Sequence, residues 1–211
     1  MKQIYFLILL LCCMTTVKAQ SNLTGLRAFV NVVSFSEPDG GPALGLEYRI
    51  KNNLSVALEG QWILYNLNHY ERDNHGFRIT PDIKFFLPGR SKHYKMFFAA
   101  QALYKQVNLY QNYIVPHIED GRQVYEELKP YELQKQMFAL GGRFGFQTNF
   151  GGENEKFFFE ASVGLGLKWR WTHYNQDPPE NSYKEGNDWF HVNSNDVLPD
   201  IPFKVRFGYR F

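Results

Sequence analysis

The chain has 211 residues, of which 44% are hydrophobic and 21% charged, so it is long enough for one domain with a substantial core. Its longest uncharged apolar run, residues 4–11, is far shorter than the roughly 20 residues of a membrane-spanning helix. A polytopic helical membrane protein is therefore excluded. Aromatic residues make up 17% of the chain, with 19 Phe and 13 Tyr beside 17 Gly, a composition that favours an all-β fold.

The first 19 residues have the pattern of a cleaved export signal. Lys2 supplies the positive charge, residues 4–11 form the apolar stretch, and Val17-Lys18-Ala19 ends the segment with small residues before Gln20. We therefore predict a signal peptide over residues 1–19 and one domain over residues 20–211.

Both cysteines, Cys12 and Cys13, lie in this segment, so the mature chain has none and cannot be stapled by disulfides. A lipoprotein is an open alternative, although Leu11 is bulky for the residue before a lipidated Cys12. Without its signal peptide the chain carries 21 basic and 21 acidic residues. Non-specific nucleic-acid binding then loses its usual driving force, and no nucleic-acid partner is expected.

Apolar and polar residues alternate along the whole mature chain, which is the period of a strand with one apolar face. In chain order the alternation predicts eight strands: 23–33, 43–51, 54–65, 76–86, 96–107, 136–149, 157–171 and 203–211. The clearest is 157–171, where every odd position is apolar. At about 3.3 Å per residue this strand is much longer than those of soluble sheets, and a lipid layer accounts for the length.

Alternation alone fits a soluble sandwich or lipocalin as well as a membrane barrel, but three features favour the barrel. The polar face is rich in glycine and charge. The connections alternate between short ones (52–53, 88–95, 150–156) and long ones (66–75, 110–135, 172–202). Aromatic residues fall into two girdles, one near the long-loop rim (Trp62, Tyr104, Trp169, Trp171) and one near the other rim (Phe85, Phe146, Phe157, Tyr209, Phe211).

The final stretch, residues 203–211, has aromatics at alternate positions and ends in Phe211. It resembles the C-terminal signal read by the barrel-assembly machinery, and the chain as a whole resembles the small eight-stranded outer-membrane barrels of the OmpA and OmpX type. The resemblance implies an eight-stranded antiparallel transmembrane up-and-down β-barrel, surrounded by lipid in a Gram-negative outer membrane. It assigns the assembly signal to Phe207, Tyr209 and Phe211. Members of this class act as adhesins, defence or anchoring proteins, and a few as lipid-modifying enzymes.

Charged side chains enclosed by such a barrel must be paired or hydrated, because a lone buried charge costs several kcal/mol. Basic residues outnumber acidic ones on the inward face. We predict a lumen charge network of Glu47, Arg49, Glu59, Arg78, Asp82, Lys84, Arg143, Glu160, Lys168, Arg170, Lys204 and Arg206. A narrow anion path or a gate is the functional alternative, and rim cations could also meet lipid phosphates.

The connection over residues 172–202 mixes aromatic and polar residues, as binding surfaces do. Its candidate binding residues for an unidentified extracellular partner are Tyr174, Tyr183, Trp189, Phe190 and His191. Long loops are usually functional or disordered, so surface shielding is the alternative. The connection over residues 110–135 is expected either to extend the outer strands or to bind cations weakly.

No catalytic, cofactor-binding or metal motif appears: the chain lacks Gly-x-Ser-x-Gly, His-Glu-x-x-His and Gly-x-x-x-x-Gly-Lys stretches. His191 and Ser194 resemble the His and Ser pair of barrels that deacylate lipid A, but the spacing differs. We therefore expect no enzyme and no cofactor, but a structural or surface-interaction protein. A lipid-modifying hydrolase and a small anion channel are the alternatives.

Overall fold

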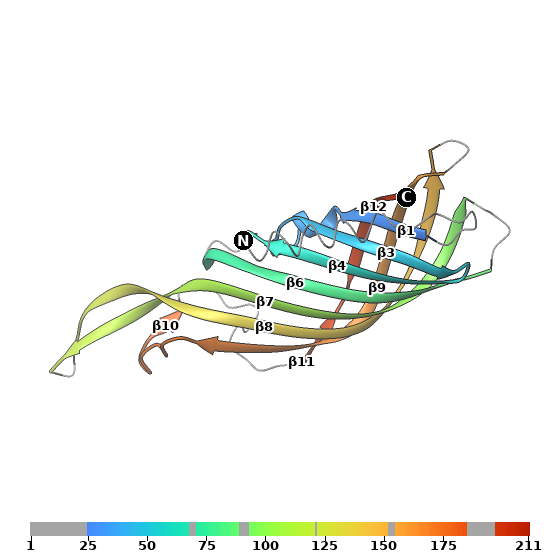
Figure 1. The fold of residues 1–211 in the computed structure, drawn as a ribbon. Helices are drawn as coiled ribbons and strands as arrows, with labels where there is room; N and C mark the ends of the chain where they lie inside the picture. The colour runs from blue at the N-terminus through green and yellow to red at the C-terminus, as the bar shows by residue number, and fades with distance from the viewer. Residues whose placement is uncertain (1–24, 68–70, 89–92, 121, 152–154, 185–196) are drawn as a thin grey trace, which may run out of the picture.

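The computed structural model describes residues 25–67, 71–88, 93–120, 122–151, 155–184 and 197–211. Within these ranges eight strands form a closed antiparallel ring in which each strand pairs with the next (Figure 1). They are β1 (Gly25–Asn31), β3 (Ala43–Lys51), β4 (Leu54–Ile63), β6 (Glu71–Phe86), β7 (Tyr94–Glu119), β8 (Arg122–Phe150), β9 (Phe157–Tyr174) and β12 (Phe203–Arg210). The ring closes because β12 pairs back with β1. The predicted eight-stranded antiparallel barrel is confirmed.

Short elements fill the connections at the long-loop end. The 3-10 helix η1 (Val33–Phe35) follows β1, and β2 (Asp39–Gly40) pairs with β5 (Tyr65–Asn66). In the last long connection, β10 (Tyr183–Lys184) pairs with β7, and β11 (Val197–Asp200) pairs with β9. In the part of the chain that the structure describes, no helix is long and apolar enough to cross a membrane.

The segment over residues 110–135 is not a loop. It continues β7 and β8 as one antiparallel hairpin whose register runs from Tyr94↔Thr148 to Glu119↔Arg122. In Figure 1 this hairpin projects well beyond the ends of the other strands. The expectation that this connection extends the outer strands is confirmed, and the strand boundaries predicted at Val107 and Gln136 were too short. The strands continue because the alternation of side chains continues: Leu109, Tyr113 and Val115, beyond the predicted strand end, are buried on the inward face.

The two faces of the barrel have inverted polarity. Outward side chains are apolar and exposed, as at Leu58 (55%) and Leu165 (73%), whereas inward Glu59, Glu160 and Arg206 are fully buried. A soluble β-sandwich or lipocalin would show the opposite arrangement, so an apolar band outside and charges inside indicate a membrane barrel. Six of the nine residues predicted for the aromatic girdles are exposed on the outside: Trp62, Phe85, Tyr104, Phe157, Trp171 and Phe211. The other three, Phe146, Trp169 and Tyr209, are half-buried.

The interior of the barrel contains aromatic side chains as well as charged residues and glycines. Phe29 and Phe158 point inward and pack with Ala57, while Phe86 and Phe97 form a second apolar cluster with Ala99. Glycines on the neighbouring strands make room for these rings. A Cβ on Gly45 would lie 2.2 Å from Cζ of Phe29, and one on Gly208 would lie 2.3 Å from Cε1 of Phe158. Sequence reasoning missed these inward aromatics.

The predicted signal peptide, residues 1–19, lies outside the described residues, and so do Trp189, Phe190 and His191.

Candidate functional site

Arg206 of β12 lies at the centre of the buried charges. Its Nε and Nη2 donate to Oε2 of Glu59 at 2.9 and 2.6 Å, and Nη2 also donates to Oδ2 of Asp82 at 2.9 Å. Its Nη1 donates to Oε1 of Glu160 at 3.3 Å. The guanidinium lies over the ring of Phe29, 4.3 Å from the centroid. One cation therefore binds three carboxylates within its own plane while an aromatic ring covers one face.

Further ion pairs branch from this centre. Arg143 donates to Asp82 and to Oγ of Ser162, both at 2.6 Å, and Lys204 donates to Glu59 at 3.2 Å. Lys84 contacts both Glu47 and Glu160. Through these pairs, and through an Arg27–Glu47 contact of 3.7 Å, the network connects β1, β3, β4, β6, β8, β9 and β12 across the lumen. Such a network links strands that are not neighbours in the ring.

The structure brings together most of the residues predicted for this network: Glu47, Glu59, Arg78, Asp82, Lys84, Arg143, Glu160, Lys204 and Arg206. Arg49 is buried but lies against Phe86 instead of a carboxylate. Lys168 and Arg170 are half-buried on β9, nearer the long-loop rim.

Two carboxylates of the lumen come from the connection between β1 and β3, not from a strand of the ring. Glu37 pairs with Arg78, and Asp39 pairs with Lys105. Strand alternation carries no signal for them, because the connection from β1 to β3 folds back over the long-loop end. Gln61 holds it there, donating through Nε2 to the carbonyls of Ser34 at 3.2 Å and Asp39 at 3.3 Å.

An apolar cluster lies at the same end of the barrel. Ile63, Val107, Leu109 and Leu133 are almost wholly buried and pack together, with Tyr174 against them. These apolar side chains and the folded connection occupy the lumen between the charge network and the long-loop end.

The projecting hairpin is buttressed where its neighbours end. The last pair of β6 with β7 is Glu71↔Gln111, and β10 continues at that edge with Tyr183↔Ile114. On the other side, the hydroxyls of Tyr113 and Tyr174 are 2.8 Å apart, and the ring of Tyr131 meets Tyr113 edge-on. The hydroxyl of Tyr183 donates to Glu126 at 2.6 Å, which raises the pKa of Tyr183. Two of the predicted loop residues, Tyr174 and Tyr183, therefore support the hairpin.

Charged and apolar residues share the outer part of the hairpin. The ring of His117 stacks on Tyr125, with centroids 4.3 Å apart, and Nε2 of His117 and Nζ of Lys129 both lie 2.9 Å from Oε2 of Glu127. The hydrogen bond from Lys129 is the largest cause of a lowered pKa of Glu127, and the hydrogen bond from His117 is the second. The bond between Lys129 and Glu127 also raises the pKa of Lys129. Ile118, Val124 and Leu128 of the same hairpin are exposed. The β7–β8 register places Ile118 and Leu128 on the face opposite to His117 and Glu127. The outer hairpin therefore presents a charged face and an apolar face to solvent.

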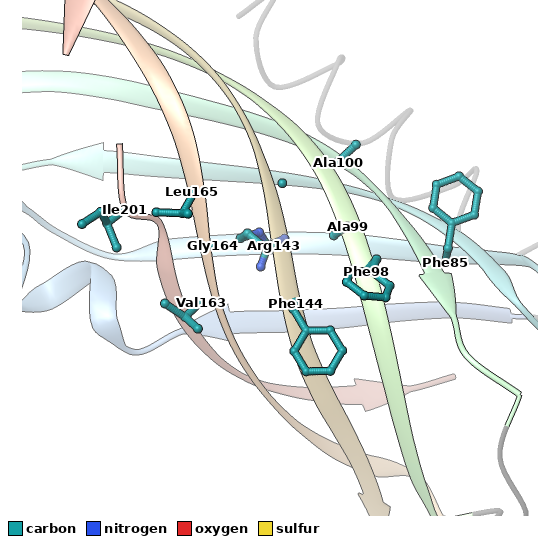
Figure 2. Close-up of a pocket in the computed structure, with 11 residues that line it drawn as sticks. Phe85, Phe98, Ala99, Ala100, Arg143, Phe144, Val163, Gly164, Leu165 and Ile201 are labelled. Atoms are coloured by element: carbon teal, nitrogen blue, oxygen red, sulfur yellow. The ribbon is translucent and has the colours of Figure 1, made fainter. Parts of the chain in front are cut away.

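A shallow groove lies on the outer face of the barrel (Figure 2). It crosses β7, β8 and β9, where the small residues Ala100 and Gly142 leave space between bulkier neighbours. Its walls are Phe85, Phe98, Phe144, Val163, Leu165 and Ile201. The charged residue in its lining, Arg143, is buried and directs its guanidinium to Asp82 in the lumen. The groove is apolar and offers no catalytic group.

In the described ranges, no three His, Cys, Asp or Glu side chains gather in a way that could hold a metal ion.

Comparison with known proteins gives a family. Residues 5–194 match the family described as "Protein of unknown function (DUF3575)". The chain belongs to this family. No curated protein matches it.

Two solved structures are similar to it. The N-terminal β-barrel domain of Pseudomonas aeruginosa OprF is 13% identical, with a TM-score of 0.42, over 89% of this chain and 96% of that one. Acinetobacter baumannii CarO is 12% identical, with a TM-score of 0.39, over 92% of this chain and 100% of that one. The closed eight-stranded ring and its apolar outer band are those of an outer-membrane β-barrel protein, in agreement with the resemblance drawn from the sequence.

Proposed function

We propose that the protein is exported by its signal peptide, spans a Gram-negative outer membrane, and acts at the cell surface through the β7–β8 hairpin. In barrels of this class the short turns face the periplasm and the long loops face outward, which puts the hairpin outside the cell. The surrounding lipid and the barrel-assembly machinery are its expected partners in the membrane, and its extracellular partner is unidentified.

One observation carries the proposal. β7 and β8 stay paired from Asn112↔Pro130 to Glu119↔Arg122, past the last pair that β6 makes. A barrel needs strands only long enough to cross the lipid, so this extension has no role in closing the ring. It presents Ile118, Val124 and Leu128 to solvent, and the charged group of Glu127 and Lys129 lies on the face opposite to Ile118 and Leu128. Exposed apolar residues that are gathered in this way often mark an interaction site.

The lumen supports an anchoring role for the barrel. Eight strands enclose an interior that side chains can fill, and here ion pairs and the Ile63 cluster occupy it. This packing favours the surface role over the anion-channel alternative. The lipid-hydrolase alternative rests on His191 and Ser194, which lie outside the described residues.

Site-directed crosslinking tests the surface role. A photo-crosslinking amino acid replaces Leu128 on the hairpin or, as the matched control, the equally exposed Leu58 on the lipid-facing band. In intact cells we expect discrete protein adducts from position 128 and none from position 58. Absence of adducts at position 128 under conditions in which the protein is folded would contradict the proposal.

A truncation complements this experiment. Replacing residues 111–131 by Asn-Gly joins the paired residues Tyr110 and Glu132 through a two-residue turn. We expect the shortened protein to keep its heat-modifiable folded form and to lose the adhesion or partner capture of the native protein. Steady ion conductance of the native protein in planar bilayers would instead support the channel alternative.

A further inference from the structure

The short-turn end of the lumen holds a group of basic side chains, which we call the basic cluster: Arg27, Arg49, Lys95 and Arg210. Arg27 and Arg49 are buried, whereas Lys95 and Arg210 are half-buried and closer to solvent. Arg27 lies directly opposite Arg210 in the β1–β12 register, and the charges of both act on Arg49. Lys95 is within electrostatic range of Arg49 and Arg27. Like charges in direct cross-strand positions are destabilising unless something compensates them.

The acceptors nearby are few. Glu47 is 3.7 Å from Arg27, and its charge and that of Glu160 also act on Arg49, but Lys84 binds both carboxylates. Nε and Nη1 of Arg27, and all three guanidinium nitrogens of Arg49, have no hydrogen-bond partner among the described residues. The buried hydroxyl of Ser55, which pairs with Arg49 in the β3–β4 register, has none either. A buried N–H or O–H group without an acceptor costs free energy. Because several such groups lie together here, an acceptor bound among them would stabilise the folded protein.

Aromatic stacking holds these guanidinium groups in place without using their N–H groups. Arg49 lies 4.0 Å from the centroid of Phe86, and Arg27 lies 5.3 Å from that of Phe158. A guanidinium stacked on a ring by cation–π attraction keeps its N–H donors directed outward within its own plane. The donors of Arg49 are therefore positioned before any acceptor arrives.

The same barrel contains the completed form of this arrangement. Arg206 stacks on Phe29 at 4.3 Å, and its in-plane donors bind the carboxylates of Glu59, Asp82 and Glu160. Arg49 repeats the stacking, but no carboxylate of the described residues meets its donors. The two sites therefore differ in one respect: Arg206 has carboxylate oxygens at its donors, and Arg49 does not.

We propose that the basic cluster, with Ser55, binds a phosphate-type oxyanion that enters from the short-turn end. A planar arginine donor set matches the oxygens of phosphate in a bidentate manner, and the surrounding positive charge favours an anion of charge two over chloride. Water can accept hydrogen bonds from these groups, but it cannot offset their mutual repulsion. Entry from the periplasm follows from the orientation under the proposed function, whereas binding itself does not depend on that orientation.

Thermal unfolding of the purified full-length protein in dodecyl maltoside, a phosphate-free detergent, tests the proposal. The probe is inorganic phosphate, with sodium chloride at equal ionic strength as the reference. A ligand that binds only the folded state raises the unfolding temperature in a saturable way. We expect this rise for the native protein and for Arg122→Gln, a charge-matched control at an exposed position near the tip of the hairpin. Arg49→Gln should weaken phosphate binding by about tenfold or more, since roughly 1.4 kcal/mol of lost charge-assisted bonding corresponds to that factor.

The same variant separates binding from a structural role. Because Arg49 makes no ion pair within hydrogen-bond distance, Arg49→Gln relieves repulsion, and we expect it to be as stable as the native protein or more stable without phosphate. If Arg49→Gln is destabilised equally in both buffers, Arg49 is structural and the proposal is overturned. Ser55→Ala, a smaller change at the same site, should also weaken the phosphate effect and serves as the second variant.

Two arms distinguish the source of the oxyanion. One uses inorganic phosphate, and the other uses maltoside micelles doped with phosphatidic acid and no free phosphate. Protection by the first alone assigns a free anion, protection by the second alone assigns a lipid headgroup, and protection by both supports a shared site. No protection in either arm beyond the chloride reference overturns the proposal, while the crosslinking at position 128 can still succeed or fail independently.

Discussion

Burial of charge is the governing feature at the scale of single residues. Glu59 is fully buried and accepts hydrogen bonds from Asn31, Lys204 and Arg206. Nη2 of Arg78 lies 3.5 Å from its Oε1, so Glu59 compensates three cations at once. Each such group is costly to bury alone, and its partners are what make the interior stable. The four inward rings of Phe29, Phe86, Phe97 and Phe158 add cation–π contacts to Arg206, Arg49, Lys84 and Arg27 in that order.

Glu59→Gln should therefore destabilise the barrel by about 3–5 kcal/mol, because it leaves buried cations without their charge partner. Urea-induced unfolding in lipid vesicles, followed by tryptophan fluorescence, measures this. Glu119→Gln, at an exposed position on the hairpin, is the matched control and should change the unfolding free energy by less than about 0.5 kcal/mol. A Glu59 variant as stable as the control would show that lumen water, and not ion pairing, compensates these charges.

At the scale of elements, β8 and β9 form one pair of strands with two different environments, lipid on the outer face and the charged lumen on the inner face. Gly164 opposes Arg143, and a Cβ on Gly164 would lie 2.1 Å from the carbonyl oxygen of Gly142, so this close approach requires glycine. One residue to either side, Val163 (52% exposed) and Leu165 point outward. A shift of one residue in this register would exchange the two faces, so register is strongly specified here.

We expect Val163→Arg to cost about 2–4 kcal/mol, since it places a cation in the middle of the lipid-facing band. The measurement is the unfolding free energy in phospholipid vesicles. Val124→Arg, at a residue that is 56% exposed on the hairpin, should be nearly neutral because that residue meets water. Equal costs for the two variants would mean that the two surfaces meet the same solvent, contrary to a membrane-spanning barrel.

The hairpin is protected as an element against unwanted pairing. Beyond β10 and the end of β9, its two outer edges are not covered by the other described strands. Pro116 of β7 and Pro130 of β8 lie on these edges, together with Lys129 and Glu127. Proline and charge are the usual means by which edge strands avoid adding further strands. Binding through side chains of the hairpin is therefore more favourable than β-augmentation.

At the scale of the whole molecule, closure of the ring depends on the last strand. β12 pairs with both β9 and β1, and the amide of Phe211 donates to the carbonyl of Leu26 at 3.1 Å. The ring of Phe211 is 63% exposed and contacts Tyr209 edge-on. Phe211 is thus placed where an assembly factor could read it and buries little surface within the fold.

Deleting Phe211 should reduce the folded, heat-modifiable protein in outer-membrane fractions several-fold and induce envelope stress. Protein refolded from urea without the assembly machinery should lose little stability, because the side chain makes few internal contacts. Phe98→Ala, an outward aromatic of β7 outside the stretch over residues 203–211, is the control and should assemble normally. Unchanged assembly of the truncated chain would contradict the signal assigned to Phe207, Tyr209 and Phe211.

The sequence by itself determined the number of strands in the ring, the face of each and the short turns, because the side-chain period of two is a local property of the backbone. At Phe157–Tyr174 nearly every residue has the face that alternation predicts. Alternation gives Phe158 the inward face, between outward Phe157 and Phe159, but it predicts a polar side chain there and not an aromatic ring.

Only the tertiary structure decided which charges meet. Glu59 and Arg206 are 147 residues apart, and their contact depends on ring closure and on the stagger of eight registers, which no single segment encodes. The same holds for Glu37, carried into the lumen by a connection, and for Arg49, whose donors meet an aromatic ring instead of a carboxylate. Periodicity is set by neighbours in the chain, whereas the pairing of buried charges is set by distances across the closed barrel.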